Sequence, residues 1–240
     1  MHVEWVSAVD STNAELVRRA SVAPLADLTV LATTDQTAGR GRLGRTWVAP
    51  SGTALAVSVF VAQGSPWLPL LTGLAMTRAV RRLVGDPAAV TLKWPNDVLI
   101  GDRKVSGILG EVVGRGAVIG AGLNLGMTPA QLPVPTATSL AIEGAEPGGL
   151  AERALDAYLA EFVALWEPFV AAGCDAGAGL AAAVSEACGT VGRTVRVELP
   201  GGATRQGIAT SIDADGRLVV LDDGEEFAVA AGDVTHVRAL

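Results

Sequence analysis

The stretch Gly39-Arg40-Gly41-Arg42-Leu43-Gly44-Arg45-Thr46-Trp47 decides which class of fold to expect. Its glycines have the spacing of a dinucleotide-binding loop, but such a loop must open a helix. Here a loop punctuated by Pro50 and Gly52 follows, and then a strand-like run at 53–62. No acidic residue stands roughly 20 residues further on, where a bound ribose would require one. The stretch therefore argues against a Rossmann fold.

The same stretch packs three arginines and three glycines into residues 39–45 of a chain whose formal net charge is −7. Arginine carries a permanent charge and a planar set of donors that matches carboxylate and phosphate oxygens. Interleaved glycines let the backbone approach a ligand closely. We interpret 39–45 as an anion-binding loop, with a solvated basic loop as the alternative on this segment alone.

Composition indicates a globular protein with no membrane contact. The 240 residues are 50% hydrophobic, which is enough for one good core and a small second domain. No apolar run approaches the ~18 residues of a membrane span, and the first residues do not resemble a signal peptide. We expect a cytoplasmic protein. The acidic net charge disfavours DNA binding, and Cys174 and Cys188 are expected to be reduced structural thiols.

Residues 1–188 are expected to form an α+β domain, in which a mixed, largely antiparallel sheet is packed by helices. Strand-like runs between 90 and 125 are separated by short turns, which imply antiparallel neighbours. A first helix is expected near Ser11, with Thr12-Asn13-Ala14-Glu15 as a capping box. The other expected elements are strands at 28–33, 53–62, 90–92, 98–100, 105–113 and 117–125, and helices at 66–84, 150–170 (interrupted at Pro168) and 177–187.

A long surface loop is expected at 126–148, where Pro, Gly and Thr are frequent. From residue 191 onward the pattern indicates only strands, separated by turn signals that include 200–202 and 232–233. Such spacing is typical of a small β-barrel of SH3-like size. We therefore expect a second domain at 189–240.

Three further segments could carry chemistry. Lys93-Trp94-Pro95-Asn96-Asp97 places a cation, an amide and a carboxylate around a proline between two strands. Either Lys93 pairs with Asp97 across a turn, or the cation meets phosphate while Asp97 helps to hold Mg²⁺ or orients a base. Lys104 starts a strand of small residues, and 120–126 is a glycine-rich strand with one amide, Asn124. Each of these segments alone is also consistent with an ordinary turn or strand.

Together the segments resemble the biotin protein ligases, which activate biotin with ATP and attach it to a lysine of a carrier protein. The family's motifs are matched, in order, by Ser11-Thr12-Asn13, 39–47, 93–97, 103–108 and 120–124. The resemblance implies a class II synthetase-like catalytic domain at 1–188, which binds biotin and ATP, and an SH3-like β domain at 189–240. Only ten residues precede Ser11, so we expect the short form without the family's DNA-binding repressor domain.

The resemblance also implies a role for each matched residue. Lys104 would contact the biotin carboxylate and the α-phosphate, and Arg42 would close over the adenylate. The residues implied in catalysis are Lys104, Arg42, Lys93 and Asp97, with Asp97 also a candidate Mg²⁺ ligand. Those implied in biotin binding are Ser11, Thr12, Asn13, Gln36, Arg40, Gly41, Arg42, Lys104 and Gly107. Those implied in ATP or adenylate binding are Arg42, Arg45, Trp47, Lys93, Asn96 and Asn124.

The implied substrates are biotin and ATP with Mg²⁺, and the implied protein partner is the biotin carboxyl carrier domain of an acyl-CoA carboxylase. A monomer or a weak, ligand-dependent homodimer is expected, on the premise that the strands 105–113 and 117–125 offer sheet edges. Three alternatives are open. A lipoate or octanoate ligase would show other motifs around its lysine, a non-catalytic sensor would not need both Lys93 and Lys104, and an RNA-binding protein would need more aromatic residues.

Overall fold

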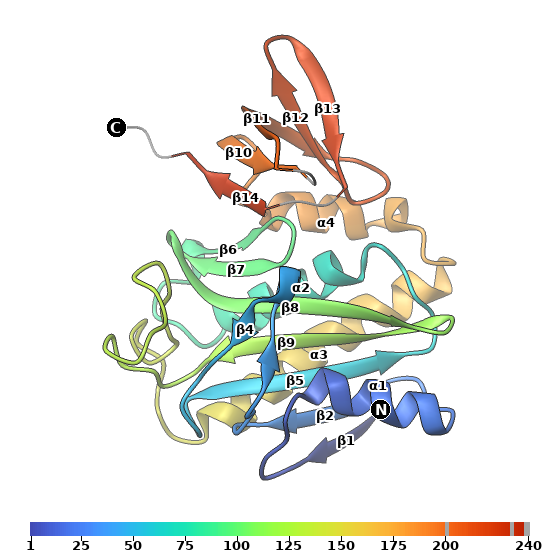
Figure 1. Ribbon diagram of the computed structural model, residues 1–240, viewed down its shortest axis with the longest axis vertical. Helices are drawn as coiled ribbons and strands as arrows, with labels where there is room; N and C mark the ends of the chain where they lie inside the picture. Colours follow the sequence, from blue (N-terminus) through green and yellow to red (C-terminus); the bar gives the residue numbers. More distant parts are fainter. Residues whose placement is uncertain (200–201, 231–232, 238–240) are drawn as a thin grey trace.

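A seven-stranded sheet with the order β1-β2-β5-β9-β8-β7-β6 frames the larger part of the molecule (Figure 1). The computed structural model describes residues 1–199, 202–230 and 233–237. β1 and β2 pair in parallel and the other neighbours are antiparallel, which confirms the mixed, largely antiparallel sheet. The strands are β1 His2–Trp5, β2 Thr29–Thr33, β5 Ala54–Val61, β6 Val90–Lys93, β7 Asp97–Ile100, β8 Arg103–Val113 and β9 Gly116–Asn124.

Helices cover both faces of this sheet. On one face α2 (Leu68–Arg81) and α3 (Leu150–Ala171) pack against the central strands and build the main hydrophobic core. On the other face α1 (Thr12–Val22) buries Leu16 against Leu31, Phe60 and Val118 in a smaller cluster. Burial on both faces explains why β5 is apolar at nearly every position rather than alternating.

Helix α1 begins one residue earlier than a capping box at Thr12 would place it. Ser11 is the N-cap, and its hydroxyl accepts a hydrogen bond from the backbone N–H of Ala14. The capping box assigned to Thr12–Glu15 is therefore wrong. Thr12 is left as the first helical residue, and its side chain is available for contacts across the sheet.

Two sequence expectations about the later segments are corrected. α3 runs without interruption through Pro168, which lies only one turn from the end of the helix. The segment 126–148 contains no helix or strand, as expected, but it is not confined to the surface. Residues 137–140 are buried, and the backbone at Ala137 forms a parallel bridge with Lys104. A segment rich in Pro and Gly can thus be buried where its backbone groups are paired.

β8 and β9 lie in the interior of the sheet, because β8 pairs with β7 and β9 pairs with β5. The premise that these strands offer edges for a homodimer is therefore wrong. The edges of the seven-stranded sheet are β1 and β6. The expected oligomeric state stays a prediction without this support.

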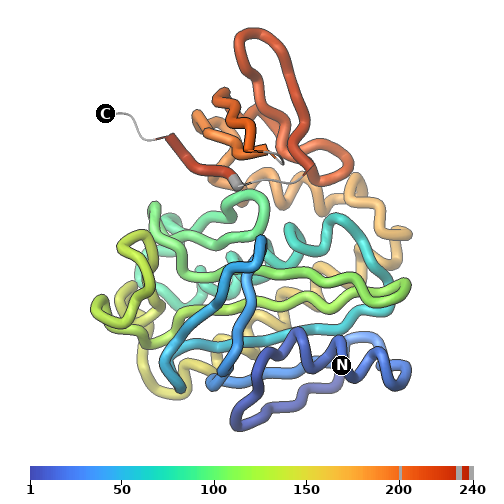
Figure 2. Tube along the Cα trace, viewed as in Figure 1, coloured from blue at the N-terminus to red at the C-terminus, as the bar shows by residue number. Residues whose placement is uncertain are grey.

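A five-stranded antiparallel sheet with the order β13-β12-β11-β10-β14 forms the C-terminal lobe (Figure 2), which confirms the expected β module. It is preceded by a 3₁₀ turn, η3 Ala176–Ala178, and by α4 Leu180–Ala187. The expected boundary at 188/189 stays a prediction, and the expected turns at 200–202 and 232–233 lie partly outside the described residues. The strands are β10 Thr194–Glu198, β11 Thr204–Ile212, β12 Leu218–Asp222, β13 Glu225–Val229 and β14 Asp233–His236.

Two tryptophans dock the C-terminal sheet onto the larger part. The indole N–H of Trp67 donates to Ala214 O at 2.8 Å, and that of Trp94 donates to Gly216 O at 2.9 Å. Both indoles are almost fully buried. One turn of the C-terminal sheet therefore satisfies both donors.

A series of hydrogen bonds also joins the 93–97 segment to residues near the C-terminal sheet. The backbone N–H of Trp94 donates to Thr190 Oγ1, which lies 3.1 Å from His236 Nε2. Arg193 lies beside the same imidazole and pairs with Asp102 at 3.1 Å. The C-terminal sheet thus contacts both the 93–97 segment and the β7–β8 turn.

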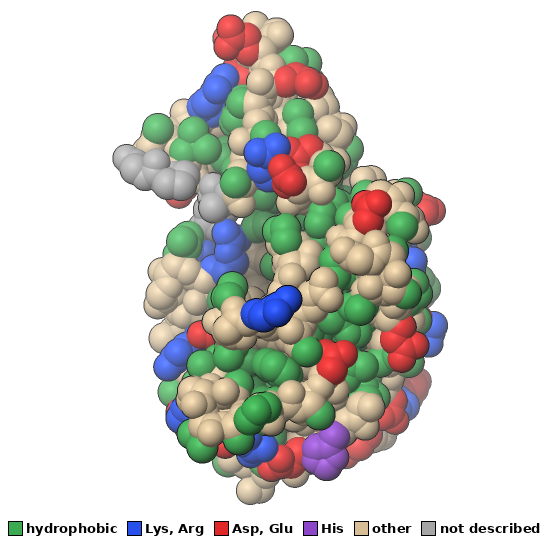
Figure 3. All heavy atoms as spheres, turned by 90° about the vertical axis from the view of Figure 1, so that its right-hand side faces the viewer, with side chains coloured by type: hydrophobic (Ala, Val, Ile, Leu, Met, Phe, Trp, Pro, Cys, Tyr) green, Lys and Arg blue, Asp and Glu red, His purple; other side chains and the backbone are tan. Residues whose placement is uncertain are grey.

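The surface shown in Figure 3 mixes acidic and basic side chains. The described residues on this face therefore do not form the single-sign basic patch typical of a nucleic-acid site. Among the described residues, no helix is both long enough and apolar enough to cross a bilayer.

His236 makes the stability of this interface depend on pH. The pKa of His236 is lowered from its ordinary 6.5 to about 4, chiefly by burial and also by the charges of Lys93 and Arg193, while Asp102 acts in the opposite direction. The unfolded chain takes up this proton near pH 6.5 and the folded chain does not, so stability is full above 6.5 and falls toward pH 4. Urea unfolding should show a lower midpoint at pH 5 than at pH 7, and His236→Gln should flatten this difference.

The matched control is His2→Gln on the exposed strand β1, which should show the same difference in urea midpoint between pH 5 and pH 7 as the unmodified protein. If His236→Gln shows the same difference in midpoint as the unmodified protein, His236 is not the cause of the pH dependence.

Candidate active site

Small residues form the floor of a cavity on the α1 side of the sheet. Strand register aligns Ser58, Gly120 and Leu109 in one row and Ala56, Gly122 and Gly107 in the next. A Cβ at Gly120 would overlap Asn13 Oδ1, and one at Gly122 would lie 2.6 Å from Trp47 Cε2. The glycines therefore let Asn13 and Trp47 lie directly on the strand backbone.

The arginine-glycine stretch forms a hairpin across this floor rather than an irregular loop (Figure 1). β3 (Gly39–Arg40) pairs with β4 (Thr46–Trp47), and the 3₁₀ turn η1 (Arg42–Gly44) joins them. Gly41 N–H donates to Arg45 O at 2.7 Å. The hairpin brings its arginines and Trp47 over β8 and β9.

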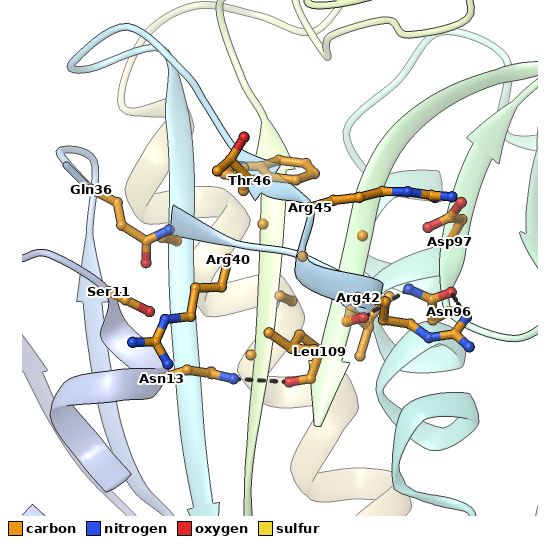
Figure 4. Close-up of a pocket in the computed structure, with 18 of the residues that line it drawn as sticks. Ser11, Asn13, Gln36, Arg40, Arg42, Arg45, Thr46, Asn96, Asp97 and Leu109 are labelled. Atoms are coloured by element: carbon orange, nitrogen blue, oxygen red, sulfur yellow. Dashed lines mark hydrogen bonds between the residues drawn. The ribbon is translucent and has the colours of Figure 1, made fainter. Parts of the chain in front are cut away.

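The cavity enclosed in this way has a volume of about 140 Å³ and is drawn in Figure 4. A second space of about 650 Å³ lies along the hairpin and shares Gln36, Arg40 and Trp47 with it. The cavity brings together twelve of the predicted site residues, namely Ser11, Asn13, Gln36, Arg40, Gly41, Arg42, Arg45, Trp47, Asn96, Asp97, Lys104 and Gly107.

Lys104 owes its direction to a β-bulge. The pairing of β7 with β8 shifts between Val98↔Ser106 and Leu99↔Lys104, so one extra residue of β8 lies between these pairs. The bulge places Lys104 on the same face as Gly107, and its Nζ lies close to the position a Cβ of Gly107 would take. Without the bulge, Lys104 would point to the opposite face of the sheet.

The ammonium of Lys104 lies between a carboxylate and an aromatic ring. Its Nζ is 2.5 Å from Asp97 Oδ1 and 5.9 Å from the centre of the Trp47 ring. Asp97 Oδ1 is buried and accepts no hydrogen bond from the described residues, so this contact is an ion pair. An ammonium has three donors, and it can therefore bind a further anion here.

Arg42 meets the 93–97 segment beside this ion pair. Its guanidinium donates to Asn96 Oδ1 at 2.8 Å (Figure 4). Asn96 is itself fixed on β8, because its Nδ2 donates to Ile108 O and its carbonyl accepts from Ile108 N–H. Lys104, Arg42 and Asp97 make this end of the cavity charged.

The opposite end of the cavity, at the start of α1, is lined by uncharged polar side chains with the guanidinium of Arg40 beside them. Gln36 Oε1 accepts hydrogen bonds from the backbone N–H and hydroxyl of Thr12. Ser58 Oγ lies 2.7 Å from Thr12 Oγ1 and 2.6 Å from Asn13 Oδ1, so its single proton can be donated to either oxygen. Thr12 thus lies behind the lining and orients Gln36, while Ser11 and Asn13 face the cavity.

Arg40 lies toward this end, on the side away from Lys104. Its guanidinium is 3.9 Å from Glu111 Oε1, and Glu111 also accepts a hydrogen bond from Asn13 Nδ2. Asn13 Nδ2 donates to Leu109 O as well (Figure 4). These contacts tie the hairpin, α1 and β8 together around the cavity.

Three predicted residues lie outside the cavity lining, namely Thr12, which lies behind it, Lys93 and Asn124. Lys93 borders a groove of about 760 Å³ between the larger part and the C-terminal sheet, together with Arg193 and His236. Asp97 and Lys104 line both the groove and the cavity, so the two spaces meet at the ion pair. Asn124 is buried, and its Nδ2 donates to Thr138 O at 2.8 Å.

Sequence reasoning singled out the glycine-rich strand at 120–126 but did not assign Gly120, Gly122 or Ser58 to the site, and these residues form its floor. A signal for the glycines was present, because they alternate along one strand and so share one face. For Ser58, inside an apolar strand, the sequence offers no comparable signal.

The donor set for a metal ion is small. Among the described residues, no group of three or more His, Cys, Asp or Glu side chains could hold a metal ion. Asp97 supplies a single carboxylate, which already pairs with Lys104. Mg²⁺ in nucleotide sites takes one or two protein carboxylates and otherwise phosphate and water oxygens. Asp97 therefore fits Mg²⁺ only as one ligand of an ion carried by the phosphates.

Comparison with known proteins identifies relatives for the whole chain. Residues 5–127 match the family model of the biotin/lipoate A/B protein ligases, and residues 190–237 match that of the biotin protein ligase C-terminal domain. The biotin–[acetyl-CoA-carboxylase] ligase of Mycobacterium tuberculosis is 40% identical over 246 residues, covering 98% of this chain and 89% of the relative.

Solved structures agree with this result. A biotin protein ligase of Aquifex aeolicus in complex with biotin and ATP is 25% identical, with a TM-score of 0.81 over 99% of both chains. A biotin protein ligase of Leishmania major in complex with biotinyl-5-AMP is 26% identical, with a TM-score of 0.61, covering 96% of this chain and 99% of the other.

The contact of Trp47 with the floor can be tested at Gly122. Gly122→Ala should displace the indole, because the new Cβ would lie 2.6 Å from Trp47 Cε2, and the hairpin should loosen. Trypsin should then cleave after Arg40, Arg42 and Arg45 several times faster than in the unmodified protein, as followed by mass spectrometry.

Gly126→Ala is the matched control, because a Cβ at Gly126 would meet no atom within 4 Å. Equal cleavage of the Gly122→Ala variant and the unmodified protein would contradict the packing of Trp47 on Gly122.

Proposed function

The chain belongs to the biotin/lipoate A/B protein ligase family, and we propose that it attaches biotin to a lysine of a biotin carboxyl carrier protein at the expense of ATP. The observation that carries this proposal is the polarity of the cavity. One end is lined by the uncharged polar side chains of Ser11, Asn13 and Gln36, with Arg40 paired to Glu111 beside them, and the other end carries Lys104 and Arg42. Biotin has the same polarity, with a neutral cyclic urea at one end and a carboxylate at the other.

Each end of the cavity suits its part of the ligand. A cyclic urea has two N–H donors and one carbonyl acceptor. The Ser11 hydroxyl, which accepts the helix-cap hydrogen bond, keeps its proton for the urea carbonyl. Thr12 holds Gln36 through two hydrogen bonds and so orients its amide. The apolar part of biotin would lie over the row of Ala56, Gly107 and Gly122 once the Trp47 indole, which rests on Gly122, moves with the hairpin.

The first step forms the mixed anhydride biotinyl-AMP. A carboxylate oxygen of biotin attacks the α-phosphorus of ATP, the bond from that phosphorus to the bridging oxygen breaks, and pyrophosphate leaves. Both reactants are anions, so a fixed cation between them lowers their repulsion and stabilises the charge that develops. Lys104 Nζ is suited to this role because it can exchange Asp97 for the two anions. No side chain has to act as a covalent nucleophile.

In the second step the amine of the carrier lysine attacks the acyl carbon of biotinyl-AMP. The amide bond forms, the bond from the acyl carbon to the phosphate oxygen breaks, AMP leaves and the attacking nitrogen loses a proton. The groove of about 760 Å³ meets the cavity at Asp97 and Lys104, where this carbon would lie. We assign the groove as the entrance for the lysine, with Asp97 beside its ammonium.

The arginine-glycine hairpin closes the cavity over the intermediate. Arg42 and Arg45 supply cations for the phosphate, and Trp47 covers the floor from above. Biotinyl-AMP is an activated anhydride that water would hydrolyse, so excluding water preserves it. The cavity of about 140 Å³ is smaller than the roughly 300 Å³ at which ligand pockets begin, which implies that the hairpin moves to admit the substrates.

Mg²⁺ would enter with the phosphates of ATP and neutralise part of their charge. Asp97 would supply one oxygen ligand when Lys104 turns to the substrates. The roles of Lys93 and Asn124 in adenylate binding have no support from their positions outside the cavity lining.

Exchange of labelled pyrophosphate into ATP tests the first step. With Mg²⁺ present, biotin should support exchange, and lipoate and octanoate should not, because neither carries a cyclic urea. Exchange with lipoate or octanoate instead would keep the mechanism and refute the choice of acid. No exchange with any acid would refute the enzymatic proposal.

Lys104→Ala should reduce this exchange by about 10²–10³-fold, because the charge built up at phosphorus loses its fixed cation. Arg115→Ala removes an exposed cation from the far end of β8 and should leave the rate unchanged. Near-normal exchange by Lys104→Ala would remove the central role of this lysine.

Arg42→Gly should release biotinyl-AMP, because the hairpin loses its hydrogen bond to Asn96 as well as a cation. The readout is biotin transfer to lysines of an added bystander protein, which should rise several-fold over the unmodified enzyme. Arg115→Gly is the matched control. Tight retention of the intermediate by Arg42→Gly would count against a closing role for the hairpin.

A further inference from the structure

The backbone of Lys104 is held by a segment that belongs to neither β7 nor β9. Lys104 N–H donates to Thr136 O, and Lys104 O accepts from Thr138 N–H, both at 2.8 Å. These bonds form the parallel bridge between Lys104 and Ala137. The bulge interrupts the regular pairing with β7 at this point, so the 136–138 segment supplies partners that the sheet does not.

A buried amide fixes this segment from the other side. Asn124, at the end of β9, donates from Nδ2 to Thr138 O at 2.8 Å. Its own backbone carbonyl accepts from Leu140 N–H at 3.0 Å. Thr138 is fully buried and Asn124 is 4% exposed, so water does not replace these bonds readily. A short chain of hydrogen bonds therefore runs from the Asn124 side chain through the Thr138 peptide groups to the Lys104 backbone.

We propose that Asn124 and Thr138 are positioning residues for Lys104, acting through the Asn124 Nδ2–Thr138 O and Thr138 N–Lys104 O hydrogen bonds. This inference rests on the proposed role of Lys104 at the carboxylate of biotin. The chain fixes the bulge that points Lys104 toward Gly107 and Asp97. It gives Asn124 a function in the complex with biotin alone, before any nucleotide binds.

The alternative is that Asn124 acts only by direct contact with the adenylate, as its motif implies. The two roles differ in what they require. A direct contact with adenylate affects nothing until the nucleotide is present. If Asn124 has a positioning role, its loss weakens biotin binding even without nucleotide, because Lys104 then contacts the biotin carboxylate less well.

The experiment is calorimetric titration of the full chain with biotin, without ATP, compared with the uncharged biotin methyl ester. Asn124→Leu keeps the approximate volume and removes the donor. It should weaken biotin about tenfold, the usual effect of one lost buried hydrogen bond, and change the affinity for the ester little. Ser139→Ala removes an equally buried hydrogen bond, to Met127 O, from the same segment and should leave biotin affinity unchanged.

A double-mutant cycle completes the test. Lys104→Ala should weaken biotin and not the ester, and adding Asn124→Leu should then cause no further loss, because the amide acts through the lysine. Circular dichroism and thermal melting check that each variant folds. If Asn124→Leu does not fold, Asn124→Ser takes its place, since the shorter hydroxyl does not reach Thr138 O.

The outcomes separate cleanly. Unchanged biotin affinity in the Asn124 variant, equal loss for biotin and ester, or additive losses in the double variant would each overturn the positioning role. If Lys104→Ala binds biotin normally, the proposed role of the lysine fails, and the inference built on it fails for that separate reason. Weaker binding of biotin but not of the ester, with no further loss in the double variant, supports the positioning of Lys104 by Asn124.

Discussion

Two side chains rest directly on the backbone of β9, with Asn13 over Gly120 and Trp47 over Gly122. No other residue type permits this approach, because a Cβ at either position would overlap the side chain above it. Asn13 belongs to α1 and Trp47 to the hairpin, so the two contacts bring both elements onto the sheet. The depth and outline of the cavity follow from these two contacts.

Charge at the site is arranged on the same frame. The hairpin brings Arg42 to Asn96, while the bulge in β8 brings Lys104 to Asp97. The cations are thus supplied by separate segments that meet at one end of the cavity. The other end is built from α1 and Gln36, with Arg40 paired to Glu111 beside them. Under the proposed function, this arrangement would bind a ligand with one neutral and one anionic end in a single orientation, which transfer of its acyl group requires.

The sequence predicted the α+β class, most strands and helices, and the segments that meet at the cavity. Local patterns carried this information: strand-like runs, a proline at a helix start, and clustered Arg, Gly and Lys. The positions of Lys93 and Asn124 were not predictable, because pairing across the sheet and burial under the 126–148 segment decide them. The bulge at Lys104 and the burial of 137–140 were missed for the same reason. Both involve the hydrogen bonds between Lys104 and the 136–138 segment, more than 30 residues along the chain, which leave no local periodicity.

The turn at Ala214 and Gly216 accepts the indole N–H groups of both Trp67 and Trp94. Trp94 is also a member of the 93–97 segment that borders the cavity. A fragment that ended at α4 would leave two buried indoles uncovered and the backbone N–H of Trp94 without Thr190. The C-terminal sheet therefore supports the segment that brings Asn96 and Asp97 to the cavity, and it lines the adjoining groove through Thr235 and His236. In a chimera of two relatives joined between α4 and β10, the C-terminal part would have to bring a turn whose carbonyls match the two tryptophans.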